Sequence, residues 1–351
     1  MLIGTIKRMK LRHALSQAIY IDQEDGTVLV EDPNLGEGVF RINGEWIRGK
    51  LRDADPHMLL FVGGPKLAKP NHSRTSSPNP KARCLPLGSN SNAPGSRSHM
   101  ELGLEGKRVL ITAASRGIGQ ATAQCFADHG CSVALCARGE KQLEIASQNL
   151  KERGVQVFSQ SLDVSNGDAL KNFISEAGEA LGGLDVYVAN ASAGAGPGEE
   201  AWQANFDIDV MGAVRGVEAS LPFLADSETA SVVFIGSTAA VEFLGAPQAY
   251  NAMKAALIAH ASDLSQSLAP RGIRVNVVSP GPVFFEGGNW EMIKQTMPQV
   301  YERALAQCAI GRMGTPDEVA RTVVFLASPA ASLITGANLV ADGGFTKRTS
   351  F

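Results

Sequence analysis

The feature that most constrains the fold is a repeated pattern of a short apolar run, a turn and a helical segment, which begins near Leu104. Strands that alternate with helices predict βαβ units, a parallel sheet and helices on both of its faces. Because βαβ crossovers are right-handed, the pattern predicts a doubly wound α/β fold. The apolar runs are residues 107–112, 131–138, 155–164, 184–191, 230–237, 273–281 and 337–344.

Composition and charge exclude several classes of protein. The 351 residues carry a formal net charge of -3, which argues against a nucleic-acid binder or a protein held at a membrane surface by charge. No apolar run is long enough for a membrane span. The five cysteines form no C-x-x-C pair and the six histidines show no metal-ligand spacing. We therefore expect a cytoplasmic protein without a structural metal or a disulfide framework.

The chain changes character near residue 100. Residues 1–62 contain the strand-like runs T-V-L-V, G-V-F-R-I and M-L-L-F-V, separated by turn signals, and predict a small β-rich module. Residues 63–99 are rich in Pro, Ser, Asn and Gly, which is typical of a flexible linker. Residues 100–351 contain the repeated strand and helix pattern and are predicted to form the main domain.

Two interpretations of the first 99 residues remain open. One is a natural appended module. The other is a fusion or expression segment, because G-S-R-S-H-M resembles a cloning junction with Met100 as the native start, and this interpretation is favoured. An organelle-targeting peptide is a weaker third possibility, since the segment is poor in Ser and is followed by strand-like sequence.

The first strand-to-helix turn is the candidate phosphate-binding element. It reads T-A-A-S-R-G-I-G over residues 112–119. Glycines let the backbone approach a pyrophosphate, and the new helix offers its N-terminal N–H groups and the positive end of its dipole. The alternative is a simple tight turn, which is less consistent with a position between a strand and a helix.

The second apolar run predicts which dinucleotide binds. It ends Cys136-Ala137-Arg138 and lacks the carboxylate that binds the ribose 2′-OH of NAD. Arg116 and Arg138 instead offer two guanidinium groups to a 2′-phosphate, so NADP is predicted in preference to NAD. The alternative is that both arginines are solvated surface residues.

Tyr250 and Lys254 are the candidate proton-transfer pair. They lie four residues apart in the helical run Y-N-A-M-K, so both side chains share one face of a helix. An ammonium beside a phenol favours the ionised phenol, and Ser237 at the end of an apolar run would orient a substrate oxygen. Such a site suits proton transfer to or from a carbonyl or alcohol oxygen. Because Y-x-x-x-K is common by chance, the prediction depends on the neighbouring motifs.

Those motifs together resemble one family. Residues 104–346 are similar to the short-chain dehydrogenase/reductase family, in particular to 3-oxoacyl-carrier-protein-reductase-like members. The resemblance implies a Rossmann-type sheet of about seven strands, and hydride transfer between NADP(H) and a ketone, 3-oxoacyl or similar, to give a secondary alcohol. It is carried by T-A-A-S-R-G-I-G, L-D-V (162–164), A-N-A-S (189–192), Ser237, Y-N-A-M-K, S-P-G-P-V (279–283), G-R-M-G-T-P-D-E-V-A (311–320) and A-N-L-V-A-D-G-G (337–344).

The resemblance also implies roles for single residues. Ser237 would hydrogen-bond the substrate oxygen, and Tyr250 would be the general acid in reduction and the base in oxidation. Lys254 would favour ionised Tyr250 and bind the nicotinamide ribose. The implied cofactor-binding residues are Thr112, Ser115, Arg116, Gly117, Ile118, Gly119, Arg138, Asp163 and Val164 beside the adenine, Asn190 and Ala191 along the cofactor trough, and Pro280, Gly281 and Val283 at the nicotinamide end.

Asp209 is the most consequential departure from the family pattern. It stands where the family usually has a catalytic asparagine that helps hold a water in a proton relay to the lysine. A carboxylate near Lys254 would stabilise the ammonium, and its ionisation would couple to that of Lys254 and Tyr250. We expect activity to be retained with a shifted pH profile. The alternative is that Asp209 points away from the relay as a solvated helix residue.

Smaller departures affect the cofactor turn and the substrate side. Ala113 replaces a usual glycine, and Phe285 replaces a usual threonine near the carboxamide, which weakens one cofactor contact. Residues 283–308 resemble a mobile lid with Gly287 and Gly288 as a hinge. Its apolar residues would form a pocket wall or, alternatively, pack into the core or a subunit interface; they are Phe284, Phe285, Trp290 and Met292.

Two alternatives to a ketone reductase remain open, and the resemblance also implies an oligomeric state. A dienoyl- or enoyl-CoA-type reductase is suggested by the aspartate at 209, although retention of Tyr250 argues against it. A catalytically silent dinucleotide sensor or scaffold is expected to lose one of Ser237, Tyr250 and Lys254, and all three are present. The resemblance implies a homotetramer or homodimer built by helices around 201–225 and 248–268, acting on a small carbonyl or alcohol.

Overall fold

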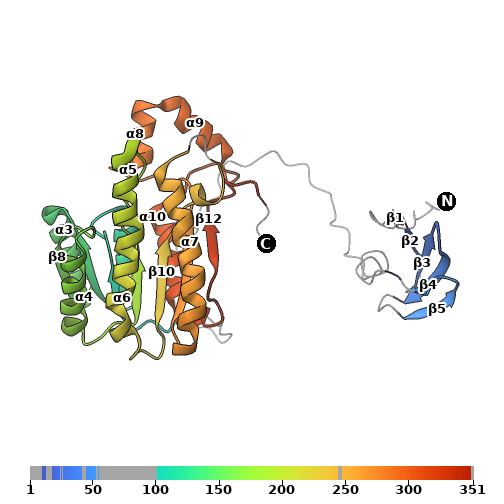
Figure 1. Cartoon of the computed structure of the whole chain (residues 1–351), viewed down its shortest axis with the longest axis horizontal. Helices are drawn as coiled ribbons and strands as arrows, with labels where there is room; N and C mark the ends of the chain where they lie inside the picture. Colours follow the sequence, from blue (N-terminus) through green and yellow to red (C-terminus); the bar gives the residue numbers. More distant parts are fainter. Residues whose placement is uncertain are drawn as a thin grey trace, which may run out of the picture. The chain divides into compact units, whose positions relative to one another are not determined.

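The computed structural model of the chain describes residues 10–12, 18–23, 25, 27–41, 45–52, 54, 101–243 and 247–348. The chain divides into two units, Met1–Asn92 and Ala93–Phe351, which are described separately below and drawn in Figure 1. The predicted M-L-L-F-V strand, the linker and Met100 lie outside the described residues.

The N-terminal unit contains a five-stranded antiparallel sheet in the order β1-β2-β3-β4-β5. Val28 and Val30 are buried, whereas Leu29 between them is only partly buried, as expected for strands with one covered face. The prediction of a small β-rich module is therefore confirmed. The strands are β1 (Lys10–Arg12), β2 (Ile19–Asp22), β3 (Thr27–Asp32), β4 (Gly36–Arg41) and β5 (Trp46–Gly49), and the core residues are Ala18, Tyr20, Val28, Val30, Phe40 and Leu51.

The C-terminal unit is built on a seven-stranded sheet in which every neighbouring pair is parallel, in the order β12-β11-β10-β9-β6-β7-β8. The strand order reverses between β6 and β9, which makes this a doubly wound sheet with its switch point there. The predicted Rossmann-type architecture is confirmed. The strands are β6 (Arg108–Ile111), β7 (Ser132–Ala137), β8 (Val157–Ser161), β9 (Val186–Ala189), β10 (Ser231–Ile235), β11 (Arg274–Pro280) and β12 (Asn338–Ala341).

Helices cover both faces of this sheet because alternate strand residues point to opposite sides. Val109 and Ile111 of β6 pack into a core with residues of α2, α3 and α10, whereas Leu110 packs into a second core with residues of α4, α6 and α7. The helices are α2 (Gly117–Asp128), α3 (Glu140–Lys151), α4 (Gly167–Leu181), α5 (Gly198–Asn205), α6 (Gly212–Leu224), α7 (Ala249–Leu268), α8 (Asn289–Thr296), α9 (Pro298–Gln307) and α10 (Pro316–Ala327).

Four short helical segments complete the C-terminal unit. One of them, η1, is a π-helix that joins α5 directly to α6, and the others are single 3₁₀ turns. Their bounds are η1 (Phe206–Met211), η2 (Thr238–Ala240), η3 (Ala269–Arg271) and η4 (Pro329–Ala331).

The predicted lid corresponds to the segment that follows β11 and contains α8 and α9, which lie beyond one end of the sheet (Figure 1). Phe284 and Trp290 pack around a small cluster formed by Ala304, Cys308, Met313 and Phe345. Phe285 packs against the main core, and Met292 is exposed. Packing within the subunit thus accounts for three of the four apolar residues predicted as a pocket wall.

Within the described ranges, no helix is both long and apolar enough to cross a membrane, and no group of three or more His, Cys, Asp or Glu side chains could hold a metal ion. The four cysteines of the C-terminal unit are free thiols. Burial raises the pKa of Cys131 and of Cys136 to about 12, so neither is a reactive thiolate.

Candidate active site

The sequence-predicted residues gather at one edge of the sheet. Thr112, Asn190 and Ser237 follow β6, β9 and β10, and Pro280 ends β11. These strands are neighbours and run parallel, so their carboxyl ends share an edge, and β6 and β9 flank the switch point. Ligands of open α/β sheets bind in the crevice at this position.

The turn between β6 and α2 has a backbone that few side chains tolerate. Ala113 and Gly117 have φ values of 52° and 56°, in the left-handed region. A Cβ at Gly119 would collide with the side-chain nitrogen of Asn190 and lie 2.7 Å from the Ala113 carbonyl oxygen, so only glycine fits there. The turn is therefore shaped for close approach of the backbone to a ligand.

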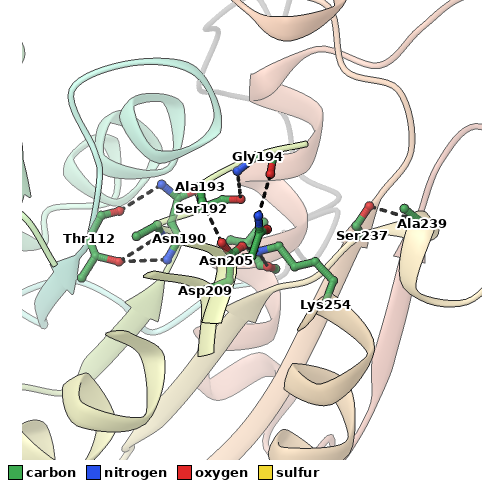
Figure 2. Close-up of polar contacts among 12 residues, drawn as sticks. Thr112, Asn190, Ser192, Ala193, Gly194, Asn205, Asp209, Ser237, Ala239 and Lys254 are labelled. Atoms are coloured by element: carbon green, nitrogen blue, oxygen red, sulfur yellow. Dashed lines mark hydrogen bonds and ion pairs between the residues drawn. The ribbon is translucent and has the colours of Figure 1, made fainter. Parts of the chain in front are cut away.

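Asn190 fastens this turn to the end of β9. Its Nδ2 donates to the carbonyl oxygens of Thr112, at 2.9 Å, and Ala113, at 3.0 Å (Figure 2). The Oγ1 of Thr112 in return accepts from the backbone N–H groups of Asn190 and Ala191, at 3.0 and 3.2 Å. Asn190 and Ala191 thus hold the turn in place at the end of β9.

The first turn of α2 provides donors for an anion. The helix starts at Gly117, directly after Ser115 and Arg116, and the first N–H groups of a helix have no partner within it. Arg116 is exposed, and Ile118 packs partly against the core. The turn and the helix start fit a pyrophosphate, and the exposed Arg116 guanidinium lies directly beside them.

A second guanidinium lies at the end of β7. Arg138 Nη1 is 3.9 Å from Asp163 Oδ2, and 72% of the Arg138 side chain is exposed, so it is free to turn toward a ligand. Hydrogen bonds from the backbone and hydroxyl of Ser165, with the charge of Arg138, hold the pKa of Asp163 below its usual range. Val164, next to Asp163, is buried in the core.

Lys254 and Asp209 form a buried ion pair at the centre of the site. Lys254 Nζ lies 3.0 Å from Asp209 Oδ1, and the two side chains are 2% and 0% exposed. Nζ also donates a 2.8 Å hydrogen bond to the Ile235 carbonyl oxygen at the end of β10. The ring centroid of Tyr250, one turn earlier on α7, is 5.8 Å from Nζ. The structure thus brings together three of the four predicted catalytic residues.

Asp209 reaches this position from the π-helix η1. Its other oxygen, Oδ2, accepts a 2.8 Å hydrogen bond from the Ala193 backbone N–H, in the loop after β9 (Figure 2). One carboxylate therefore contacts an ammonium and an amide from two different elements. Asp209 is not the solvated helix residue of the alternative interpretation.

Asn205 is a site residue that the sequence did not single out. It is 1% exposed, and its Nδ2 donates to the carbonyl oxygens of Gly194, at 3.0 Å, and Ala201, at 2.8 Å. Together with Asp209 it holds the backbone at 193–194 (Figure 2). The only signal in the sequence was its place four residues before Asp209, and its orientation depends on the start of the π-helix.

Ser237 is the N-cap of η2, which packs against α7. Its Oγ accepts a 3.1 Å hydrogen bond from the Ala239 N–H, and the residue is 8% exposed (Figure 2). Because that bond uses an oxygen lone pair, the hydroxyl hydrogen is left to donate elsewhere. This is the polarity needed to hold a carbonyl oxygen.

The remaining predicted cofactor residues line the end of β11. A Cβ at Gly281 would come within 2.6 Å of the Asp342 Cβ, so the chain passes close to the loop after β12. Val283 is buried and pairs with Gly314 in an isolated parallel bridge. Pro280, Gly281 and Val283 therefore lie at the same edge of the sheet as the other predicted site residues, in close contact with the neighbouring chain.

Comparison with known proteins agrees with this geometry. The sequence model of the family described as "Enoyl-(Acyl carrier protein) reductase" matches residues 112–346. The chain belongs to the short-chain dehydrogenase/reductase family. Among curated members of the family, the isoepoxydon dehydrogenase of Penicillium expansum is 39% identical over 254 residues, which cover 71% of this chain and 98% of that protein. The 3-oxoacyl-[acyl-carrier-protein] reductase of Thermotoga maritima is 31% identical over 246 residues, 69% and 98% of the two chains.

Solved structures of family members are also similar. L-sorbose reductase from Gluconobacter frateurii, solved with NADPH and L-sorbose, is 30% identical with a TM-score of 0.66, over 71% of this chain and 100% of that one. A short-chain dehydrogenase from Burkholderia cenocepacia, solved with NADP, is 30% identical with a TM-score of 0.64, over 69% and 98% of the two chains. The predicted resemblance to this family is confirmed.

Proposed function

We propose that the protein is an NADP(H)-dependent oxidoreductase that interconverts a small or medium ketone and a secondary alcohol. NADPH, when bound, supplies the hydride. The observation that carries the proposal is the buried Lys254 ammonium, held by Asp209 and Ile235 at the end of β10, one helical turn from Tyr250. Isoepoxydon dehydrogenase and NADPH-bound L-sorbose reductase among its relatives support the same reaction class.

The cofactor residues suit NADP. The T-A-A-S-R-G-I-G turn and the start of α2 would hold the pyrophosphate, and Arg116 and Arg138 would bind the 2′-phosphate. β7 ends at Ala137 without a carboxylate that would repel a phosphate. The residues that would border the rest of the cofactor are Asp163, Val164, Asn190, Ala191, Pro280, Gly281 and Val283.

The proton chemistry follows from four side chains. Ser237 donates its hydroxyl hydrogen to the substrate carbonyl oxygen, since its lone pair is used by the Ala239 amide. Tyr250 gives its phenolic proton to the same oxygen as the hydride reaches carbon, and takes it back in the oxidation direction. Lys254 favours the resulting phenolate through its charge. Asp209 pairs with Lys254 inside the fold, where neither side chain is accessible to solvent.

The test is NADPH consumption by the purified chain with a panel of ketones that includes L-sorbose and a 3-oxoacyl thioester, and with enoyl thioesters. We expect turnover of at least one ketone, and a fall in kcat of about 10² to 10⁴-fold in Tyr250→Phe while NADPH still binds. NADPH binding with no turnover of any compound would instead indicate a dinucleotide sensor. Turnover of enoyl thioesters alone would indicate the enoyl reductase alternative, which the family description and Asp209 favour.

A further inference from the structure

Two contacts join the loop after β11 to the turn before α2. Arg116 Nη1 donates a 2.6 Å hydrogen bond to the Gly287 carbonyl oxygen. The Phe285 ring lies against Gly117, since a Cβ placed on Gly117 would come within 2.6 Å of the Phe285 Cζ. We call these four residues, Arg116, Gly117, Phe285 and Gly287, the clasp.

The clasp is continuous with α8. The Gly287 N–H donates a 2.7 Å hydrogen bond to Glu291 Oε2 in the first turn of α8, and the Gly288 N–H donates to the Phe285 carbonyl oxygen at 3.0 Å. Gly287 has a φ of 72°, which glycine tolerates and other residues rarely adopt. These bonds connect Phe285 and Gly287 to the first turn of α8, the helix that carries Trp290.

The clasp involves groups that the proposed function assigns to the cofactor. The Phe285 ring touches Gly117, the first residue of α2, where the pyrophosphate would be held. Arg116 is one of the two guanidinium groups assigned to the 2′-phosphate. A phosphate bound to both terminal nitrogens of Arg116 takes Nη1 from Gly287, and a charge-assisted bond to a phosphate is stronger than one to a neutral carbonyl.

We propose that Arg116 determines cofactor specificity by exchange: it closes the dinucleotide groove through Gly287 and opens it only when a 2′-phosphate replaces that carbonyl. This inference rests on the proposed NADP(H) function. NADH, which has no phosphate to compensate for the lost contact, binds only to the fraction of molecules in which the clasp is open. Its apparent affinity is lowered by that fraction.

The affinity for NADH distinguishes this exchange from a simpler role in which Arg116 only binds the 2′-phosphate. If Arg116 only attracts the phosphate, Arg116→Ala weakens NADPH and leaves NADH unchanged. If Arg116 also closes the clasp, the same substitution weakens NADPH and strengthens NADH binding, by about fivefold, because the closed state loses its main polar contact. Among the described residues, the Arg138 side chain pairs with Asp163 and has no hydrogen bond or ion pair to the loop after β11, so Arg138→Ala is the matched control.

The experiment measures dissociation constants and association rates of NADPH and NADH by stopped-flow fluorescence. The proteins are the unmodified chain, Arg116→Ala, Phe285→Leu and Arg138→Ala. We expect Arg116→Ala and Phe285→Leu to raise the association rate of NADH, whereas Arg138→Ala lowers NADPH affinity and leaves NADH within about twofold. Phe285→Leu keeps an apolar side chain against the core, and circular dichroism verifies that each variant is folded.

A second readout needs no nicotinamide. In a chain carrying Trp46→Phe and Trp202→Phe, the fluorescence of Trp290 should change on addition of 2′,5′-ADP, which carries the 2′-phosphate, and not on addition of 5′-ADP. The proposed exchange at the clasp would be overturned by an unchanged NADH affinity in Arg116→Ala. An equal gain in NADH affinity in Arg138→Ala would overturn it too. Failure of the unmodified chain to bind either dinucleotide would instead overturn the proposed function.

Discussion

At the scale of single residues, Asp209 shows how the surrounding donors suit a carboxylate rather than the amide of an asparagine. Its two oxygens face an ammonium and an amide N–H, so both need to be acceptors. A carboxylate satisfies both donors, whereas an asparagine side chain has one acceptor oxygen and an NH₂ group that would face a donor. The position is therefore fitted to aspartate in this chain.

The Asp209→Asn substitution should cost about 1 to 3 kcal/mol in the free energy of unfolding, because one buried donor loses its acceptor. The substitution also removes a negative charge that lies 3.0 Å from Lys254 Nζ. We expect activity to persist with a shifted pH–rate profile. Urea denaturation and kcat/KM against pH measure the two effects. An unchanged profile and rate would show that Asp209 does not tune the pair.

For single residues, the sequence predicted which side chains take part in the site better than it predicted what they contact. The four-residue spacing of Tyr250 and Lys254 places them on one helix face whatever the tertiary structure, so that prediction needed only local geometry. The contact of Asp209 with Lys254 was expected from the family resemblance. Asn205 was missed because its bond to Gly194 links a helix to a loop, and no spacing in the sequence reveals such a pairing.

At the scale of elements, the seven strands were predictable because each buried strand is a short apolar run between turn signals. The π-helix η1 was not. A π turn replaces ordinary helical hydrogen bonds and persists only where tertiary contacts compensate, and π turns frequently occur at functional sites. Here the compensation includes the bonds of Asp209 to Lys254 and Ala193, which the helical pattern of 201–225 does not encode.

The start of α10 offers a prediction about stability. Thr315 and Glu318 form a capping box, and Arg312 Nη2 lies 2.6 Å from Glu318 Oε1. We expect Thr315→Ala to lower the free energy of unfolding by about 1 kcal/mol, since α10 packs into the core beside α2. Chemical denaturation measures this. Thr322→Ala on the same helix, whose hydroxyl bonds only a helix carbonyl, is the control and should have less than half the effect.

The same box predicts a dependence on pH. The hydrogen bond from Arg312, reinforced by the Thr315 backbone N–H, lowers the pKa of Glu318 from 4.5 to about 2. A depressed carboxyl pKa stabilises the fold above the unfolded value of 4.5, and this contribution is lost as pH falls toward 2. Because Glu318 is partly exposed, the effect is small. Glu318→Gln should reduce the acid-induced loss of stability in this window, and an identical loss in both proteins would contradict this assignment.

At the scale of the whole molecule, we propose that the chain assembles as a homotetramer or homodimer through α5, α6 and α7. Trp202 and Phe206 lie four residues apart at the α5–η1 junction and are 48% and 43% exposed, which is unusual for large apolar side chains. The double substitution Trp202→Glu and Phe206→Glu should lower the mass in light scattering to that of a smaller species. Ile145→Glu on α3, equally exposed at 52%, is the control and should leave the assembly intact.

The N-terminal unit is a separate element of the molecule. Its described strands have a core of their own, and the family match begins only at residue 112. We propose that residues 100–351 form the catalytic domain, 63–99 a linker and 1–62 a module or fusion segment. A chain that begins at Met100 should keep kcat/KM and assembly within about twofold, because the site residues described above all lie between Thr112 and Val283. A larger loss would show that the first residues contribute to the site or to the assembly.

The most direct test of the central claim follows the hydride itself. NADPH deuterated at the nicotinamide carbon that carries the hydride is incubated with the chain and a ketone that it reduces, and the product is analysed by mass spectrometry and NMR. The account predicts deuterium on the carbinol carbon of a secondary alcohol, with a rate that collapses in Tyr250→Phe. Deuterium on a carbon of a former C=C bond, or undiminished transfer in Tyr250→Phe, would contradict it.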